Sequence, residues 1–238
     1  LTSVMGVNVV KGLQCTDANQ KYDKIHACAK HFAVHSGPEW NRHEFNAENI
    51  KPRDLHETYL VPFEALVKEG KVKEVMCAYN RLEGDPCCGS DRLLMQILRQ
   101  EWGYEGIVLS DCGAIDDFYR EKGHKTHPDA ESASAAAVLS GTDLECGSSY
   151  KALVESAKKG LISEKDIDVS VKRLLKARFE LGEMDDPSKV EWTKIPYSVV
   201  CSAEHDSLSL DIARKSMTLL LNKNNILPLK RGGQTIRS

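Results

Sequence analysis

Short apolar runs alternate along the chain with longer segments whose apolar residues recur at helical spacing. The clearest run, 107–109, is short, β-branched and bounded by glycines, which favours a buried parallel strand over a helix. The predicted strands are 25–33, 72–79, 107–110 and 142–146. The predicted helices are 2–13, 53–69, 91–102, 127–140, 149–159 and 163–181, the last with a Ser163–Asp166 cap signal.

Strands that alternate with helices at this spacing predict βαβ units and therefore a parallel sheet. Roughly four such units are visible, which fits either half of a (β/α)8 barrel or most of a small doubly wound sheet. No glycine-rich phosphate-binding motif follows any of the strands, so the pattern does not support a nucleotide site.

The chain changes character after residue 183. The segment 184–202 contains Asp185-Asp186-Pro187 and scattered polar residues, as is typical of a linker. A predicted helix at 204–215 and a predicted strand at 217–221 follow it. We therefore expect a barrel domain at 1–183, a linker at 184–202 and the truncated start of a second α/β domain at 203–238. Because both ends lack a closing element, we expect a fragment of a longer protein.

Composition excludes two classes of partner. The chain has 238 residues and a net charge of −3, so it carries no basic field for nucleic acid and no polybasic membrane patch. No apolar run is long enough to span a bilayer. The sequence thus points to a chain that recognises neither nucleic acid nor membrane.

Eight cysteines are present, and none has the C-x-x-C spacing of a zinc site. We expect buried free thiols at positions in or just beyond apolar runs, namely Cys28, Cys77, Cys112 and Cys146. A disulfide between Cys112 and Cys146 is the alternative in an oxidising compartment.

Chemically useful side chains follow the predicted strands. Because the carboxyl ends of neighbouring parallel strands meet at one mouth, these groups are expected to gather there. They are Lys30, His31, Met76, Tyr79, Asp111, Asp143 and Glu145. Cations beside Asp111 would keep its carboxylate ionised. Each residue also has a plain interpretation: Asp111 as a helix cap, Met76 and His31 as core, and Lys30 as a surface lysine.

Four motifs resemble glycoside hydrolase family 3 in their order and spacing. They are Lys30-His31-Phe32-Ala33, Met76-Cys77-Ala78-Tyr79-Asn80, Gly106 to Asp111, and Gly141-Thr142-Asp143. Leu181-Gly182 and the tail 221–229 look like the end of that family's barrel domain and the entry into its second domain. The resemblance implies an α/β fold, the C-terminal half of a (β/α)8 TIM-like barrel followed by a linker into a missing second α/β domain.

The resemblance also implies a function. Asp111 would be the nucleophile of a retaining β-glycosidase that removes terminal non-reducing β-linked xylose or glucose from oligosaccharides or aryl glycosides through a covalent intermediate. Lys30 and His31 would hold sugar hydroxyls, and Met76 and Tyr79 would shape the first subsite. The segment 42–47 and Ser110-Asp111-Cys112 are similar to the β-xylosidase-like branch. No metal or cofactor is required, and the family favours a periplasmic or secreted location.

Two departures from the family limit this prediction. The early barrel strands and the second domain, which usually supplies the acid/base Glu, have no counterpart in this chain. We therefore expect it to be inactive alone, because half of the site is missing.

Two other functions are consistent with the residues. A non-catalytic carbohydrate-binding fragment would use the same half-site. A metal-dependent barrel hydrolase would use a different set of ligands, namely His31, His35, Asp111, His124 and His127.

Overall fold

The computed structural model describes residues 1–14 and 20–229. The chain divides into two compact units, Leu1–Thr193 and Lys194–Ser238. None of the described helices has the length and apolar character needed to cross a membrane.

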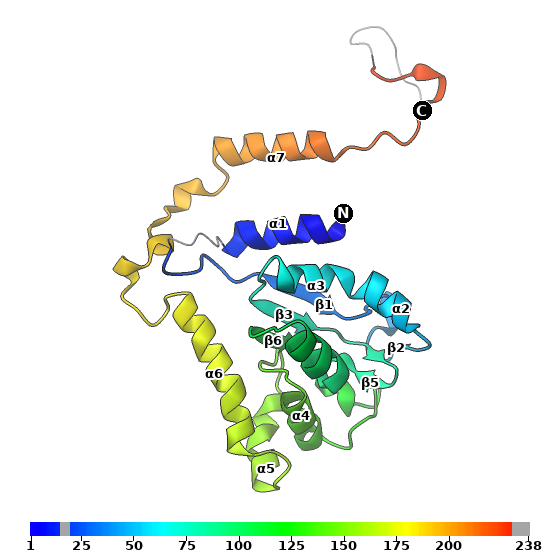
Figure 1. The fold of residues 1–238 in the computed structure, drawn as a ribbon, viewed down its shortest axis with the longest axis vertical. Helices are drawn as coiled ribbons and strands as arrows, with labels where there is room; N and C mark the ends of the chain where they lie inside the picture. The colour runs from blue at the N-terminus through cyan, green and yellow to red at the C-terminus, as the bar shows by residue number, and fades with distance from the viewer. Residues whose placement is uncertain (15–19, 230–238) are drawn as a thin grey trace. The chain divides into compact units, whose positions relative to one another are not determined.

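A parallel sheet forms the centre of the first unit. Its strands are β1 (Cys28–Phe32), β3 (Glu74–Cys77) and β6 (Ile107–Ser110), in the order β1-β3-β6 (Figure 1). The expected fourth strand, 142–146, is reduced to one parallel bridge between Leu144 and Leu109. The strands therefore follow one another without a reversal, as in a (β/α)8 barrel and unlike a doubly wound sheet. The predicted α/β, TIM-like fold is confirmed.

Helices connect the strands as the periodicity predicts. The α-helices of the first unit are α1 (Thr2–Gln14), α2 (Pro52–Asp54), α3 (Val61–Lys68), α4 (Ala130–Leu139), α5 (Leu153–Lys158) and α6 (Glu164–Glu180). Leu55–Tyr59 and Arg92–Glu101 form π-helical segments. The predicted cap at Ser163 is present, because Ser163 and Asp166 bond each other's backbone N–H groups.

Short 3-10 turns complete the chain trace. They are Glu39–Asn41, Cys87–Gly89, Asp116–Phe118, Ser149–Ala152, Pro187–Lys189, Glu191–Lys194, Tyr197–Val199 and Lys223–Asn225. The turn Asp116–Phe118 follows β6 and carries two buried carboxylates, Asp116 and Asp117.

The core lies between the sheet and its connecting helices. Phe32 and Val108 are completely buried, and the Phe32 ring packs edge-on against Phe63 at 5.1 Å and Trp102 at 5.9 Å between centroids. Leu94 and Leu98 of the Arg92–Glu101 helix are also fully buried. Each such side chain contributes about 1.5–3 kcal/mol by leaving water, so this packing fixes the strands and hence the residues at their ends.

A second small sheet was not predicted. It contains β2 (Asn46–Ala47), β4 (Arg81–Leu82) and β5 (Asp85–Pro86), in segments for which neither strand nor helix was predicted. The β4–β5 hairpin turns at Glu83 and Gly84, which both have positive φ. That is the requirement of a type I′ turn, which Asn-Gly or Asp-Gly would have signalled more clearly than Glu-Gly. β2 pairs with β4, so the loops after β1 and β3 are joined.

The second unit contains α7 (Ala203–Ser216), which confirms the helix expected at 204–215. The strand expected at 217–221 is not formed. Leu219, Leu220 and Leu221 are instead mostly exposed, because the described part of this unit offers no strand for them to pair with. The domain boundaries proposed from the sequence stay a prediction.

Two disulfides correct the expectation of free thiols. Cys112 is bonded to Cys146, and Cys77 is bonded to Cys88. The first joins the segment after β6 to the segment after the Leu144 bridge. The second was not predicted, because Cys88 lies in a loop whose path the sequence pattern does not fix.

Candidate active site

Asp111 lies where β6 ends. Its backbone N–H donates to the Cys77 carbonyl at 3.2 Å, so it continues the sheet for one further residue. Oδ1 accepts from the Cys112 N–H at 2.8 Å, and the side chain is 14% exposed. The next helical turn begins only at Asp116, so the alternative of a helix cap is wrong. The carboxylate is oriented by backbone and still reachable from solvent.

His31 is the side-chain partner of that carboxylate. Its Nε2 lies 3.2 Å from Asp111 Oδ2, although 80 positions separate the two residues in the printed sequence. Burial lowers the pKa of His31, and the charge of Asp111 opposes this only in part. The neutral form of the imidazole is therefore favoured, with Nε2 facing the carboxylate. The role of His31 in binding sugar stays a prediction.

Tyr79 follows β3 and faces the same segment. Its hydroxyl donates to the Cys112 carbonyl at 2.8 Å. Burial, reinforced by the charge of Asp111, raises the pKa of Tyr79 to about 12. The phenol is thus a permanent donor at physiological pH, fixed next to the carboxylate.

Lys30 and Met76 share one face of the sheet. Pairing of Cys28 with Glu74 and of Met76 with Leu109 places these alternate residues on one side, the less buried one. Asp111 follows Leu109 by two residues and continues that face. Within the described residues no ion pair joins Lys30 to Asp111. The register and the contacts above therefore bring the other four predicted residues to one face or end of the sheet around Asp111, with roles that stay predictions.

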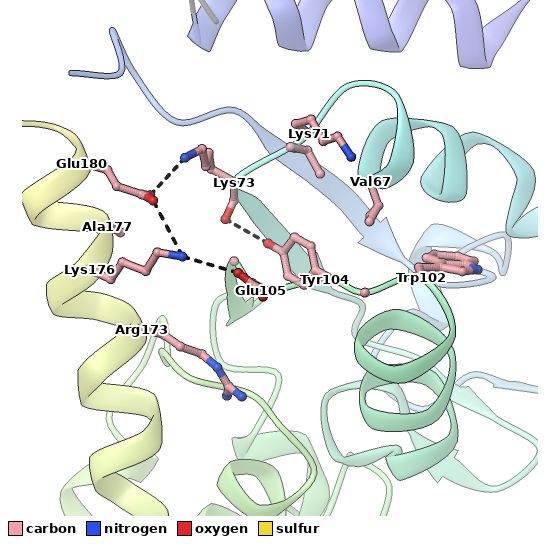
Figure 2. A pocket seen from close by; sticks show the side chains of 13 residues that line it. Val67, Lys71, Lys73, Trp102, Tyr104, Glu105, Arg173, Lys176, Ala177 and Glu180 are labelled. Carbon is pink, nitrogen blue, oxygen red and sulfur yellow. Dashed lines mark hydrogen bonds and ion pairs between the residues drawn. The ribbon is translucent and has the colours of Figure 1, made fainter. Parts of the chain in front are cut away.

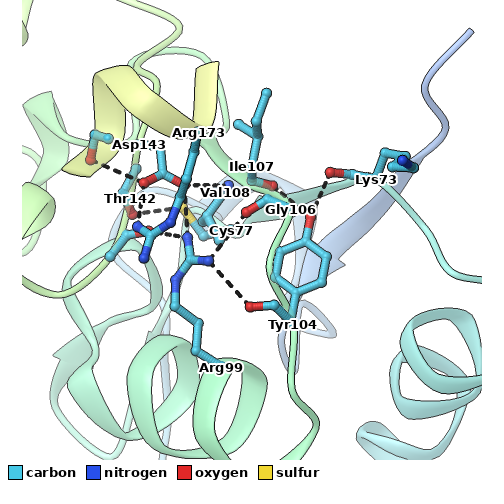
Figure 3. A network of polar contacts seen from close by, with 12 residues as sticks. Lys73, Cys77, Arg99, Tyr104, Gly106, Ile107, Val108, Thr142, Asp143 and Arg173 are labelled. Carbon is cyan, nitrogen blue, oxygen red and sulfur yellow. Dashed lines mark hydrogen bonds and ion pairs between the residues drawn. The ribbon is translucent and has the colours of Figure 1, made fainter. Parts of the chain in front are cut away.

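Asp143 is not part of this site, contrary to the expectation. Its side chain is fully buried and accepts from Arg99 at 2.7 Å, Arg173 at 2.8 Å and Ser170 at 3.0 Å (Figure 3). The Val108 N–H also donates to it, at 2.9 Å. Every oxygen of Asp143 is therefore committed to holding α6 and the Arg92–Glu101 helix against β6.

Glu145 is also committed elsewhere. Its two oxygens accept from the backbone N–H groups of Ser149 at 2.8 Å and Tyr150 at 2.6 Å. It therefore stabilises the start of the Ser149–Ala152 turn, as acidic residues do at the first turn of a helix. The segment that carries Asp143 and Glu145 does lie beside β6, as the sequence pattern predicted. The pattern did not show that both side chains are bound by other groups.

Three histidine and arginine contacts were missed by sequence reasoning. His35 Nδ1 lies 3.1 Å from Oδ1 of the buried Asn80, and His43 Nδ1 lies 2.7 Å from Oδ2 of Asp117. The Arg42 guanidinium lies over the Tyr79 ring, 5.1 Å from its centroid. Arg42 and His43 stand in a motif that the sequence analysis used only to choose a family branch.

The opposite end of the sheet is occupied by ion pairs. A cavity of about 230 Å³ there is lined by residues that precede the strands or lie on α6, among them Lys73, Tyr104, Lys176 and Glu180 (Figure 2). Lys73 Nζ lies 3.1 Å from Glu180 Oε2, and Tyr104 donates to the Lys73 carbonyl at 2.9 Å. This end of the sheet is a cross-linked scaffold, away from Asp111.

A metal site among the predicted ligands is not assembled. In residues 1–14 and 20–229, the one group of three potential ligands within 4.8 Å of one another is Asp23, His26 and Glu180. It lies at the start of the strands, and the Lys73 ammonium is 2.9 Å from Asp23 Oδ2. The five residues proposed for a metal-dependent hydrolase do not form such a group.

Comparison with known proteins gives a consistent result. The sequence model described as "Glycosyl hydrolase family 3 N terminal domain" matches residues 1–177. A xylan 1,4-beta-xylosidase of Xylanibacter ruminicola is 58% identical over 238 residues, which are 99% of this chain and 27% of that protein. Beta-D-xylosidase 1 of Arabidopsis thaliana is 37% identical over 224 residues, 92% of this chain and 28% of that protein. The chain thus spans about a quarter of the length of these relatives.

Solved structures agree. A GH3 exo-beta-xylosidase in complex with a xylobiose aziridine activity-based probe superposes with a TM-score of 0.88 at 30% identity, covering 97% of this chain and 30% of that one. A mutant beta-glucosidase of Listeria innocua in complex with laminaribiose has a TM-score of 0.83 at 27% identity, covering 95% and 31%.

Proposed function

Because the chain belongs to glycosyl hydrolase family 3, we propose that it carries the nucleophile half of the active site of a retaining β-glycosidase. Asp111 is the proposed nucleophile. The observation that carries this proposal is the geometry of Asp111. It is a partly exposed carboxylate at the end of β6 that lies 3.2 Å from His31 Nε2 and accepts a hydrogen bond from the Cys112 N–H. Named relatives that act on β-xylosides and β-glucosides support it.

The proposed reaction has two displacements. Asp111 attacks the anomeric carbon of the terminal sugar and forms a glycosyl ester, while an acid protonates the departing oxygen. Water activated by the same group then releases the sugar with its configuration retained. His31 and the Cys112 N–H hold the carboxylate during the attack, and Tyr79 holds the backbone beside it through the Cys112 carbonyl. Lys30 and His31 are proposed to bind sugar hydroxyls, with Met76 and Tyr79 shaping the subsite.

The proposed substrate is a terminal β-linked xylose or glucose, with xylose favoured. The most similar relatives reported above are named xylosidases, and Cys112 follows the proposed nucleophile where many β-glucosidases of the family carry Trp. The acid/base group is proposed to come from a part of the longer polypeptide that corresponds to the remainder of these relatives.

Covalent labelling tests the role of Asp111. The chain should be placed within the Xylanibacter ruminicola xylosidase in exchange for the segment that it matches, and the chimera treated with a 2-fluoro-xyloside. We expect mass spectrometry to find the label on a peptide that contains Asp111, and Asp111→Asn to abolish it. Label on Asp143 or Glu145 would overturn the assignment, and Asp143→Asn is not informative here because it disturbs the scaffold. Binding of xylobiose without any labelling would favour a carbohydrate-binding role.

A second test uses the chain alone. Without an acid/base group, hydrolysis of alkyl xylosides is expected to be roughly 10²–10⁴-fold slower than in the chimera. Dinitrophenyl xylosides need little protonation, so azide should intercept their glycosyl intermediate. Efficient turnover of an alkyl glycoside by the isolated chain would show that it holds its own acid, with Glu39 the first residue to replace.

A further inference from the structure

We propose that Asp117 and His43 are positioning residues that hold Arg42 and Tyr79 beside Asp111. This inference rests on the proposed glycosidase function, which it deepens by assigning two residues that do not touch the nucleophile. Asp117 lies on the Asp116–Phe118 turn after β6, and His43 lies in the loop after β1. Their contact joins two loops at the same end of the sheet.

The Asp117 carboxylate needs a partner. Asp117 is only 3% exposed, and an unpaired buried carboxylate would cost several kcal/mol. Its Oδ2 lies 2.7 Å from His43 Nδ1, which the structure offers as its side-chain hydrogen-bond donor among the described residues. Arg120 and Asp116 add a positive and a negative charge nearby. His43 is thus held in place by a group that solvent hardly reaches.

The hydrogen bonds fix the tautomer of His43. A carboxylate only accepts, so Nδ1 carries the proton that is donated to Asp117. Nε2 then keeps its lone pair, and it accepts from Arg42 Nε at 3.2 Å. Asp117, His43 and Arg42 therefore form one directional chain in which each bond requires the one before it.

The hydrogen-bonded series Asp117–His43–Arg42 ends beside Tyr79, the neighbour of the proposed nucleophile. The His43 ring packs edge-on against Tyr79 with 4.6 Å between centroids, and Arg42 lies over the same ring. Arg42 donates from Nε to His43 and from Nη1 to Glu39, the latter at 2.6 Å. Within the described residues, the Nη2 N–H groups of this partly exposed guanidinium have no protein acceptor. Tyr79 in turn bonds the Cys112 carbonyl. Asp117 therefore sets the position of two groups suited to contact sugar hydroxyls without contacting sugar itself.

The isolated chain tests the tautomer directly. Imidazole ¹⁵N shifts of His43 should report a neutral ring protonated at Nδ1. Asp117→Asn preserves shape but can donate from its amide, so it should shift the ring toward the Nε2–H form, which cannot accept from Arg42. An Nε2–H ring in the unmutated chain would overturn the proposal.

Kinetics of the chimera test the consequence. In His43→Asn the amide can still donate to Asp117, but it is too short to accept from Arg42. We expect this variant to lower kcat/KM for xylobiose roughly 10–100-fold, because one charge-assisted hydrogen bond is lost. Asp117→Asn should act similarly. His56→Asn is the matched control, since His56 is exposed on the Leu55–Tyr59 segment, and it should change kcat/KM less than about twofold.

A double-mutant cycle separates positioning from simple destabilisation. If Asp117 acts through Arg42, Asp117→Asn should have little further effect on kcat/KM in an Arg42→Ala background. Additive losses, or unchanged kcat/KM in His43→Asn, would overturn the inference. Labelling of Asp111 in the unmutated chimera keeps the two questions apart. If Asp111 is labelled but the losses are additive, only the positioning role is rejected. If Asp111 is not labelled, the proposed function itself is rejected.

Discussion

Asp111 lies two residues after Leu109, and Asp143 lies one residue before Leu144, the bridge partner of Leu109. The two carboxylates have opposite surroundings. The Asp111 side chain is 14% exposed, and its ion-pair partner among the described residues is His31, whose pKa burial lowers. Asp143 is 0% exposed and is held by two arginines, a serine and a backbone N–H. One carboxylate keeps a free face toward the sheet end, and the other has none.

The difference teaches that a strand-end carboxylate is not a reactive group by position alone. A nucleophile must stay accessible and lightly bonded, so that its lone pairs reach a substrate. A structural carboxylate must be saturated, because an unpaired buried charge is costly. The number and charge of the partners therefore distinguish the two residues better than their place in the chain does.

The largest effect is expected for Asp111→Asn in the chimera. Loss of a nucleophile should lower kcat by on the order of 10⁴-fold or more, while the free energy of unfolding should change by less than about 1 kcal/mol. Steady-state hydrolysis of a xyloside and denaturant unfolding measure the two quantities. A variant that lost stability but kept kcat would reverse the assigned roles of Asp111 and Asp143.

Asp143→Ala should show the opposite pattern. Removing it leaves Arg99 and Arg173 without their buried partner, which should cost about 3–5 kcal/mol of unfolding free energy. Urea titration of the isolated chain measures this loss. Asp168→Ala on the exposed side of α6 is the control and should stay within about 0.5 kcal/mol. Equal stability of the two variants would contradict the scaffold role of Asp143.

The Cys112–Cys146 disulfide sharpens the comparison, because it connects the segment of the proposed nucleophile to the segment that follows Asp143. Replacing both cysteines by serine should lower the unfolding free energy by about 2–4 kcal/mol under oxidising conditions. The difference from the unmutated chain should vanish once both are reduced. Peptide mapping that found both thiols free under oxidising conditions would contradict the bond.

A smaller effect is expected from pH, at a histidine that contrasts with His31. His124 is 6% exposed, stacks on Phe118, and has no hydrogen-bond partner on either ring nitrogen in the described structure. Burial, with the charge of Arg81, lowers the pKa of His124 to about 4. The unfolded chain therefore binds a proton first as pH falls below about 6.5, and stability decreases down to about pH 4.

The loss from His124 should reach at most about 3 kcal/mol. His124→Phe should remove this part of the pH dependence, measured as the difference in unfolding free energy between the two proteins at pH 7, 5.5 and 4. His205→Phe on α7 serves as the exposed control. Parallel curves for the unmutated chain and His124→Phe would refute the assignment.

Periodicity predicted the elements better than it predicted the contacts between them. The α6 helix, its Ser163–Asp166 cap and the β6 strand were recovered because each depends on neighbouring residues. The β4–β5 hairpin was missed because its Glu83-Gly84 turn lacks a strong local signal. The Cys77–Cys88 bond could not be read from spacing, since it depends on how the chain passes through that hairpin to the Cys87–Gly89 turn.

The candidate site was predictable only in part for a similar reason. Strand ends and family resemblance pointed to Asp111 and His31, which the structure brings within hydrogen-bonding distance. They also pointed to Asp143, because nothing local shows that Arg99 and Arg173 lie behind it. His43 and Asp117 are 74 residues apart, and their pairing requires the register of β1, β3 and β6.

The pairing of β2 with β4 has a consequence for how substrate range could be altered. In barrel enzymes, each loop at the active end is usually exchanged separately while the scaffold stays intact. Here Asn46 pairs with Arg81 and Ala47 pairs with Leu82, so backbone pairing joins the loop after β1 to the loop after β3. A change of length in one would break its pairing with the other. Exchange of these loops with those of a relative should therefore replace residues 34–47 and 78–90 together.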